Sequence, residues 1–228
     1  MAMKIDPAGW PFILGGAVTT LVLWLLAGPI AGVPLLFVSA FLLFFFRDPD
    51  RVHDAGPSAV LSPADGRVMV AGEPTGEATP PGRWQQVSVF LSPMDVHVNR
   101  IPVSGRVTRV EYHPGRFLPA YRKDSGDLNE RSEIAIDHGG QHIVVRQIVG
   151  VLARRVVCRT REGLEVKAGD RFGIMKFGSR MDVFLPVDAT LHVRVGDTVV
   201  GGRTVIATLA PSAAKEAHIG LEAHDARC

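Results

Sequence analysis

The stretch RFGIMKFGSRMDVFLP, from Arg171 to Pro186, says most about the fold of this chain. It contains two runs with the character of β-strands, 171–177 and 181–186, on either side of Gly178-Ser179. A Gly-Ser pair is ordinary in a turn, whereas here it interrupts apolar, strand-like sequence. The stretch therefore indicates β-structure with a break whose purpose needs explaining.

Similar short runs fill the chain beyond Asp54, and glycine, proline or other turn residues separate them. Helical periodicity is weak throughout this region. Many short strands with frequent turns are typical of an all-β sandwich or barrel. We therefore predict a mainly β domain over residues 53–210, with strands at 60–61, 66–71, 84–91, 96–101, 105–112, 133–137, 142–151, 156–158, 180–185, 190–193 and 203–209.

The beginning of the chain has a different character. Residues 12–26 and 30–46 are almost wholly apolar, and Gly28-Pro29 separates them. A helix needs about 20 apolar residues to cross a bilayer, so each stretch is marginal alone. We predict a hydrophobic helical hairpin over residues 1–52 that enters or dips into a membrane, with a single kinked span as the second choice. A hairpin buried in a soluble core is a weaker alternative, because so long an apolar segment is hard to bury in a small protein.

Composition limits the other possibilities. A net charge of +2 gives no argument for nucleic acid as a partner. The two cysteines, Cys158 and Cys228, lie far apart, which suits a reducing compartment and disfavours a thiolate zinc site. Arg47 and Arg51 follow the second apolar stretch and favour a cell-membrane protein whose main domain is cytoplasmic. We assign no structure to the tail, 211–228.

Gly178-Ser179 is suited to an intramolecular reaction. Glycine tolerates strained backbone and leaves its carbonyl unhindered, so the hydroxyl of Ser179 could attack the carbonyl of Gly178. A serine hydroxyl needs a base, commonly a histidine with an orienting carboxylate. His97, in Ser92-Pro93-Met94-Asp95-Val96-His97, and Asp65, in Ser62-Pro63-Ala64-Asp65-Gly66, can supply these parts. Each of these residues alone fits a turn or a solvated strand face, and no second histidine lies near His97 at a spacing that suits a metal.

These segments together resemble the phosphatidylserine decarboxylases. The resemblance also includes Phe177-Gly178-Ser179, Asn129-Glu130-Arg131 and Gln147-Ile148-Val149-Gly150, spans about residues 49–209, and is nearest to the short archaeal-type branch. It implies a proenzyme that cuts itself between Gly178 and Ser179. Ser179 would become a pyruvoyl group, the cofactor at the start of a small subunit, 179–228.

By the same resemblance, phosphatidylserine would form a Schiff base with the pyruvoyl carbonyl, lose carbon dioxide and leave as phosphatidylethanolamine. His97 would act as the base and Asp65 would orient or polarise it. Longer bacterial members have a second histidine three residues after the position of His97, where this chain has Arg100. We therefore assign both proton-transfer roles to His97. Arg100 and Arg180 could contact the lipid phosphate, although solvated surface positions are the simpler expectation.

Other functions remain open from sequence. Val195-Gly196-Asp197-Thr198-Val199 resembles a pattern of biotinyl and lipoyl carrier sandwiches, without the acceptor lysine that carriers need. A membrane-anchored, non-catalytic β-sandwich is therefore one alternative. A pyruvoyl decarboxylase of a soluble amino acid is another, and the apolar hairpin argues against it. A homo-oligomer is possible, and the loop 114–132 could be a lid or filler.

Overall fold

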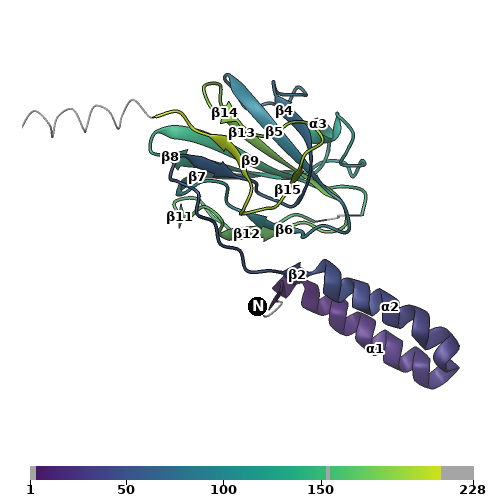
Figure 1. Cartoon of the computed structure of the whole chain (residues 1–228). Helices are drawn as coiled ribbons and strands as arrows, with labels where there is room; N and C mark the ends of the chain where they lie inside the picture. The colour runs from purple at the N-terminus through teal and green to yellow at the C-terminus, as the bar shows by residue number, and fades with distance from the viewer. Residues whose placement is uncertain (1–3, 153–154, 212–228) are drawn as a thin grey trace, which may run out of the picture.

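The computed structural model describes residues 4–152 and 155–211. In this part of the chain a helical hairpin projects from a β-rich body (Figure 1). The hairpin consists of the 3-10 turn η1 (Pro7–Gly9), α1 (Trp10–Ala27) and α2 (Pro29–Phe45), and the body contains the short helix α3 (Ser125–Leu128). The strands are β1 (Lys4–Ile5), β2 (Arg47–Asp48), β3 (Ala59–Leu61), β4 (Gly66–Gly72), β5 (Trp84–Leu91), β6 (Val98–Arg100), β7 (Gly105–His113), β8 (Arg131–His138), β9 (Gln141–Ile148), β10 (Val157–Cys158), β11 (Glu165–Val166), β12 (Arg171–Ile174), β13 (Ser179–Pro186), β14 (Thr190–Leu191), β15 (Thr198–Val199) and β16 (Val205–Thr208).

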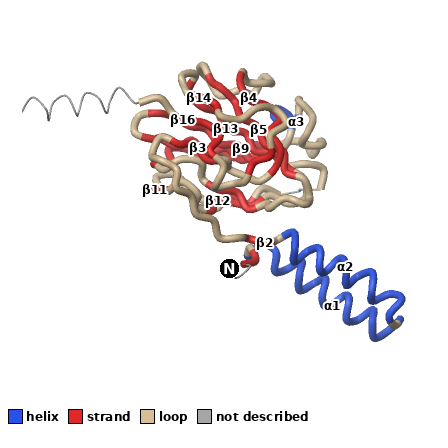
Figure 2. The backbone as a smooth tube through the Cα atoms, in the orientation of Figure 1, coloured by secondary structure: helices blue, strands red, loops and turns tan. Residues whose placement is uncertain are grey.

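An antiparallel sheet of eight strands forms the main layer of the body, in the order β11-β7-β8-β9-β13-β5-β4-β15. Figure 2 shows its strands crossing the middle of the body. The outer strands β11 and β15 do not pair with each other among the described residues, so this sheet is open and not a closed barrel. The predicted mainly β fold is confirmed. Of the two architectures predicted, a sandwich or a barrel, a closed barrel is absent from the described part of the chain.

Two three-stranded sheets, β10-β12-β6 and β14-β16-β3, contribute the other side of the core. The main hydrophobic cluster joins Val89 and Val183 of the large sheet to Phe172 of β12 and Ile206 of β16, and all four side chains are buried. Apolar side chains at alternate positions of short strands meet here between layers, as the sequence pattern predicts.

Strand β13 lies between β9 and β5, near the middle of the large sheet. Met181, Val183 and Leu185 belong to the core cluster, whereas Arg180 and Asp182 alternate with them and are buried on the opposite face. Since side chains alternate along a strand, Ser179 lies on the same face as Met181. The first residue of β13 is thereby directed into the body.

The helices of the hairpin meet at Gly28, whose backbone has φ +71° and whose N–H donates to the Trp24 carbonyl. Glycine adopts this conformation without cost, and Pro29 follows as the first residue of α2. Most of the apolar surface is exposed, with Ile30 at 90% and Leu26 at 79%. The predicted helical hairpin is present, and the segment Pro7–Ala27 is long and apolar enough to cross a membrane.

Predictions were also made for the domain boundaries, the tail and the loop 114–132. The boundaries at residues 52 and 210 stay predictions, and residues 212–228 of the predicted tail lie outside the described residues. The loop 114–132 contains α3 and ends in the first residues of β8. Asn129 in this segment is fully buried and donates to the carbonyls of Leu118 and Val149, so it fastens the loop to the end of β9.

Candidate functional site

Gly178-Ser179 lies at the entrance to β13. Phe177 has φ +56° and Gly178 has φ +77°, so consecutive residues adopt left-handed backbone just before the strand starts. Such a conformation costs a residue with a side chain about 1–2 kcal/mol, which Phe177 must bear. Ser179 then pairs with Leu91 of β5. It is fully buried, and its Oγ has no hydrogen-bond partner among the described residues.

The carbonyl of Gly178 lies tightly against Gly150, at the end of β9. A Cβ atom placed on Gly150 would be 2.1 Å from the Gly178 oxygen and 3.1 Å from its carbonyl carbon. Only a glycine allows the two backbones to approach so closely. The sequence places Gly150 in a characteristic segment, whereas its contact with the Gly-Ser bond emerges only from the fold.

His97 is the side chain that faces this bond. The N–H of Gly178 lies 3.3 Å from Nε2 of His97 and donates to it, so Nε2 carries no proton. Nδ1 lies 3.0 Å from the Asp95 carbonyl and therefore carries the proton that it donates. This tautomer directs the basic nitrogen at the dipeptide, as a group that accepts a proton there requires.

Burial is the main reason why His97 is neutral. It lowers the pKa of His97 to about 4, outweighing the Asp95 carbonyl hydrogen bond and the charge of Asp95, which raise it. The charge of Arg47 lowers the pKa further, and that of Asp65 raises it. At neutral pH the imidazole is therefore available as a base.

Asp65 acts on His97 through its charge. Among the described residues, its carboxylate accepts hydrogen bonds from both terminal nitrogens of Arg51 and from the N–H of Gly201. The Gly201 nitrogen lies 2.8 Å from Oδ1 of Asp65. The proton on Nδ1 of His97 instead goes to the Asp95 carbonyl. The structure thus brings Ser179, Gly178 and His97 together and gives Asp65 a bidentate ion pair with Arg51.

Arg100 and Arg180 are buried, whereas we expected both on the solvated surface. Their exposed fractions are only 3% and 1%. Arg180 donates to Asp182 at 2.6 Å and to Ser88 at 3.1 Å on the far face of the large sheet. Arg100 donates to the carbonyls of Gly169 and Pro49, at 2.9 and 2.7 Å. Arginine is rarely buried unless it is paired, and no local sequence pattern indicates these partners.

Asn99 and Gln147 form a buried polar pair that sequence reasoning missed. Nε2 of Gln147 donates to Oδ1 of Asn99 at 2.8 Å, and both residues are almost completely buried. Asn99 Nδ2 and Gln147 Oε1 have no partner among the described residues. Asn99 follows His97 by two positions, and Gln147 pairs with Met181, which follows Ser179 by two positions. The period of two shared by His97 and Asn99 is the sequence signal that could have found this pair.

No group of three or more His, Cys, Asp or Glu side chains in residues 4–152 and 155–211 could hold a metal ion. The turn with the carrier-like pattern serves the fold. Gly196 N–H donates to the Val68 carbonyl at 2.8 Å, and the following strand β15 pairs with β4. These contacts account for that pattern structurally.

Comparison with known proteins gives a consistent result. The sequence profile described as phosphatidylserine decarboxylase matches residues 38–207. A protein of Granulibacter bethesdensis named phosphatidylserine decarboxylase proenzyme is 44% identical over 90% of this chain and 85% of its own length. Proteins of the same name from Symbiobacterium thermophilum and Solibacter usitatus are 44% and 42% identical, over 94% and 97% of their lengths and 88% and 90% of this chain. The match to this profile over most of the chain and the identity to these relatives show that this chain belongs to the phosphatidylserine decarboxylase family.

Proposed function

We propose that this protein cuts itself between Gly178 and Ser179, and that the resulting enzyme converts phosphatidylserine to phosphatidylethanolamine. The observation that carries the proposal is the contact of Gly178 N–H with Nε2 of His97, beside a buried Ser179 Oγ that has no partner among the described residues. A nucleophile without competing hydrogen bonds and an unprotonated imidazole are the two parts that the scission needs.

In the first step, His97 Nε2 accepts the proton of Ser179 Oγ as this oxygen attacks the Gly178 carbonyl carbon. The C–N bond breaks, the nitrogen takes up the proton, and an ester joins Gly178 to Ser179. Removal of the α-proton of residue 179 then expels the Gly178 carboxylate. The dehydroalanine left behind tautomerises to an imine, and one water molecule hydrolyses it to a ketone and ammonia.

The residues present fit a pyruvoyl group at position 179. The position is buried, the basic nitrogen of His97 faces the adjoining bond, and the unpartnered amide of Asn99 lies two positions beyond His97. A pyruvoyl group supplies a carbonyl that condenses with an amine and accepts electrons when carbon dioxide leaves. His97 would hold and return the proton at Nε2, and Asp65 and Asp95 favour its protonated form through their charges.

The hairpin supports a lipid substrate and a location at the cell membrane. Its exposed apolar side chains require a hydrophobic surrounding, and a lipid substrate gives the enzyme a reason to stay at that surface. The cytoplasmic orientation depends on Arg47 and Arg51, which follow the second apolar helix. The two fragments, 1–178 and 179–228, would be the subunits.

Mass spectrometry of the full-length protein in detergent tests the scission. We expect two fragments, the smaller beginning with a ketone at position 179 and closed to amino-terminal sequencing. Ser179→Ala should remain a single chain, whereas Ser58→Ala, at an exposed serine, should be cut normally. An uncut wild-type chain that still releases carbon dioxide would overturn the proposal.

Carbon dioxide release tests the substrate. Phosphatidylserine in mixed micelles should be decarboxylated and free serine should not. A preference for free serine would identify a pyruvoyl decarboxylase of a soluble amino acid. A chain that is neither cut nor active on either compound would leave a membrane-anchored β-sandwich.

A further inference from the structure

The hairpin ends inside the candidate site. Phe45, the last residue of α2, is completely buried. Its ring centroid lies 4.3 Å from that of His97 and 4.5 Å from that of Phe177, on which it stacks. Phe46 packs edge-on against Phe45 at 5.1 Å. A residue of the membrane-associated segment therefore touches both the basic side chain and the residue before Gly178.

This contact continues into a small hydrophobic cluster at the foot of the hairpin. Ile13 of α1 and the phenylalanines at the end of α2 join Val98 of β6 and Ile174 of β12. The cluster is separate from the main core of the body. The hairpin thus packs on the small β10-β12-β6 sheet, on the side where His97 lies.

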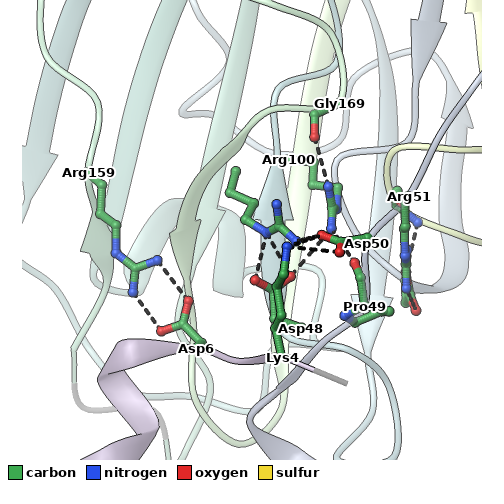
Figure 3. Close-up of polar contacts among 12 residues, drawn as sticks. Lys4, Asp6, Asp48, Pro49, Asp50, Arg51, Arg100, Arg159 and Gly169 are labelled. Carbon is green, nitrogen blue, oxygen red and sulfur yellow. Dashed lines mark hydrogen bonds and ion pairs between the residues drawn. The ribbon is translucent and has the colours of Figure 1, made fainter. Parts of the chain in front are cut away.

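Ion pairs fix the foot in this position, as Figure 3 shows. Before α1, Asp6 receives two hydrogen bonds from Arg159, at 2.6 and 2.7 Å. After α2, Asp48 accepts from Arg171 at 2.8 Å. Asp6 N–H also donates to the Phe46 carbonyl at 2.9 Å, which joins the two ends of the hairpin. The segment before α1 and the segment after α2 are thereby both attached to the body.

The charged groups that act on His97 are Asp95, Asp65 and Arg47. Asp95 lies in the turn before His97, Asp65 lies in the turn before β4, and Arg47 follows the end of α2. The carboxylates raise the pKa of His97, and Arg47 lowers it. The aromatic ring of Phe45 covers the imidazole itself and keeps water from it, and loss of water is the largest cause of the low pKa.

We propose that Phe45 is a positioning residue for self-cleavage, so that the foot of the membrane hairpin forms one wall of the catalytic site. Its ring holds the imidazole of His97 against Gly178 and supports the left-handed backbone of Phe177. The hairpin then has a role in the chemistry as well as in membrane attachment. This inference rests on the proposed function, because it concerns the same scission.

Phe45→Leu and Phe45→Ala in the full-length protein test the inference. Phe37→Leu is the matched control, since Phe37 lies on the same helix and is 73% exposed. The first measurement is the rate of self-cleavage between pH 4.5 and pH 8 after synthesis. The second is the histidine NMR titration in a Ser179→Ala background, with His97→Gln used to assign the signal.

In the wild type we expect a cleavage rate that changes little above about pH 5, because His97 is already neutral there. In both Phe45 variants the acid limb of the profile and the titration of His97 should move up by about one unit or more, as water reaches the imidazole. The rate at pH 7 should fall about tenfold or more, because the imidazole is less well held. Phe37→Leu should match the wild type in every measurement.

A lower cleavage rate at every pH with an unmoved midpoint, together with an unmoved titration of His97, would overturn the inference. If Phe45→Ala does not fold, Phe45→Leu, which keeps an apolar side chain of similar size, decides the question. A wild type that never cleaves would instead refute the proposed function, so the two failures are distinguishable.

Discussion

The close approach of Gly150 to the Gly178 carbonyl gives the sharpest prediction, through Gly150→Ala. The new methyl carbon would start 2.1 Å from the Gly178 oxygen. Real Cβ atoms essentially never lie closer than 3.0 Å to such an atom, so the two backbones must separate by about 1 Å. Displacement of a reacting group by that distance slows an intramolecular step by about 100-fold. We therefore expect self-cleavage at about 1% of the wild-type rate.

The assay follows the disappearance of the full-length chain after cell-free synthesis in the presence of detergent. Gly56→Ala is the matched control, because nothing lies within 4 Å of a Cβ atom at Gly56. Crowding itself can destabilise a protein by about 1–3 kcal/mol, so thermal unfolding is compared in a Ser179→Ala background. Cleavage of Gly150→Ala at the wild-type rate would refute the assigned geometry of the Gly178 carbonyl. Loss of folding instead of rate would show that the contact serves stability alone.

The remaining predictions concern stability. In a Ser179→Ala background the free energy of unfolding should fall by about 3 kcal/mol between pH 6.5 and pH 4. The reason is that His97, with its pKa of about 4 in the folded protein, binds a proton more weakly in the folded state than in the unfolded state. His97→Gln should remove this part of the loss in denaturant titrations, and an identical loss in both proteins would contradict the assigned burial. Gln147→Leu should cost about 1–3 kcal/mol, because it removes the hydrogen bond to the buried Oδ1 of Asn99 and leaves that oxygen without its donor. Replacing both Asn99 and Gln147 by leucine should cost less than the single change, and a double variant that is less stable than Gln147→Leu would argue against the pair.

The sequence predicted those features that depend on local pattern. Alternating apolar residues located most of the strands, and Gly28-Pro29 located the break between the helices. The strands β1, β2, β11 and β15, each of two residues, were missed because so short a segment has no recognisable period. The open edge of the large sheet could not be predicted, since local alternation is the same in a sandwich and a barrel.

In the candidate site, the sequence predicted roles for the Gly-Ser bond and for His97, but it did not predict which residues surround them. The contacts of Phe45 with His97 and of Gly150 with Gly178 join residues that are far apart in the chain, and no local pattern encodes them. The buried ion pair between Arg51 and Asp65 is likewise a product of tertiary structure. Arg180 was expected in solvent because a charged residue is usually exposed, and its hydrogen bonds to Asp182 and Ser88 make its burial tolerable.

The place of β13 in the large sheet would determine how the two fragments stay together after the proposed cut. The small fragment would begin with β13, which pairs with β5 on one side and β9 on the other. A middle strand would therefore belong to the small fragment, and both of its neighbours would belong to the large fragment. β16 pairs with β3 and β15 with β4 in the same manner, across the division. Strands of the two fragments alternate within the sheets, so separating the fragments would require the sheets to unfold. No covalent link is then needed to hold the mature molecule together.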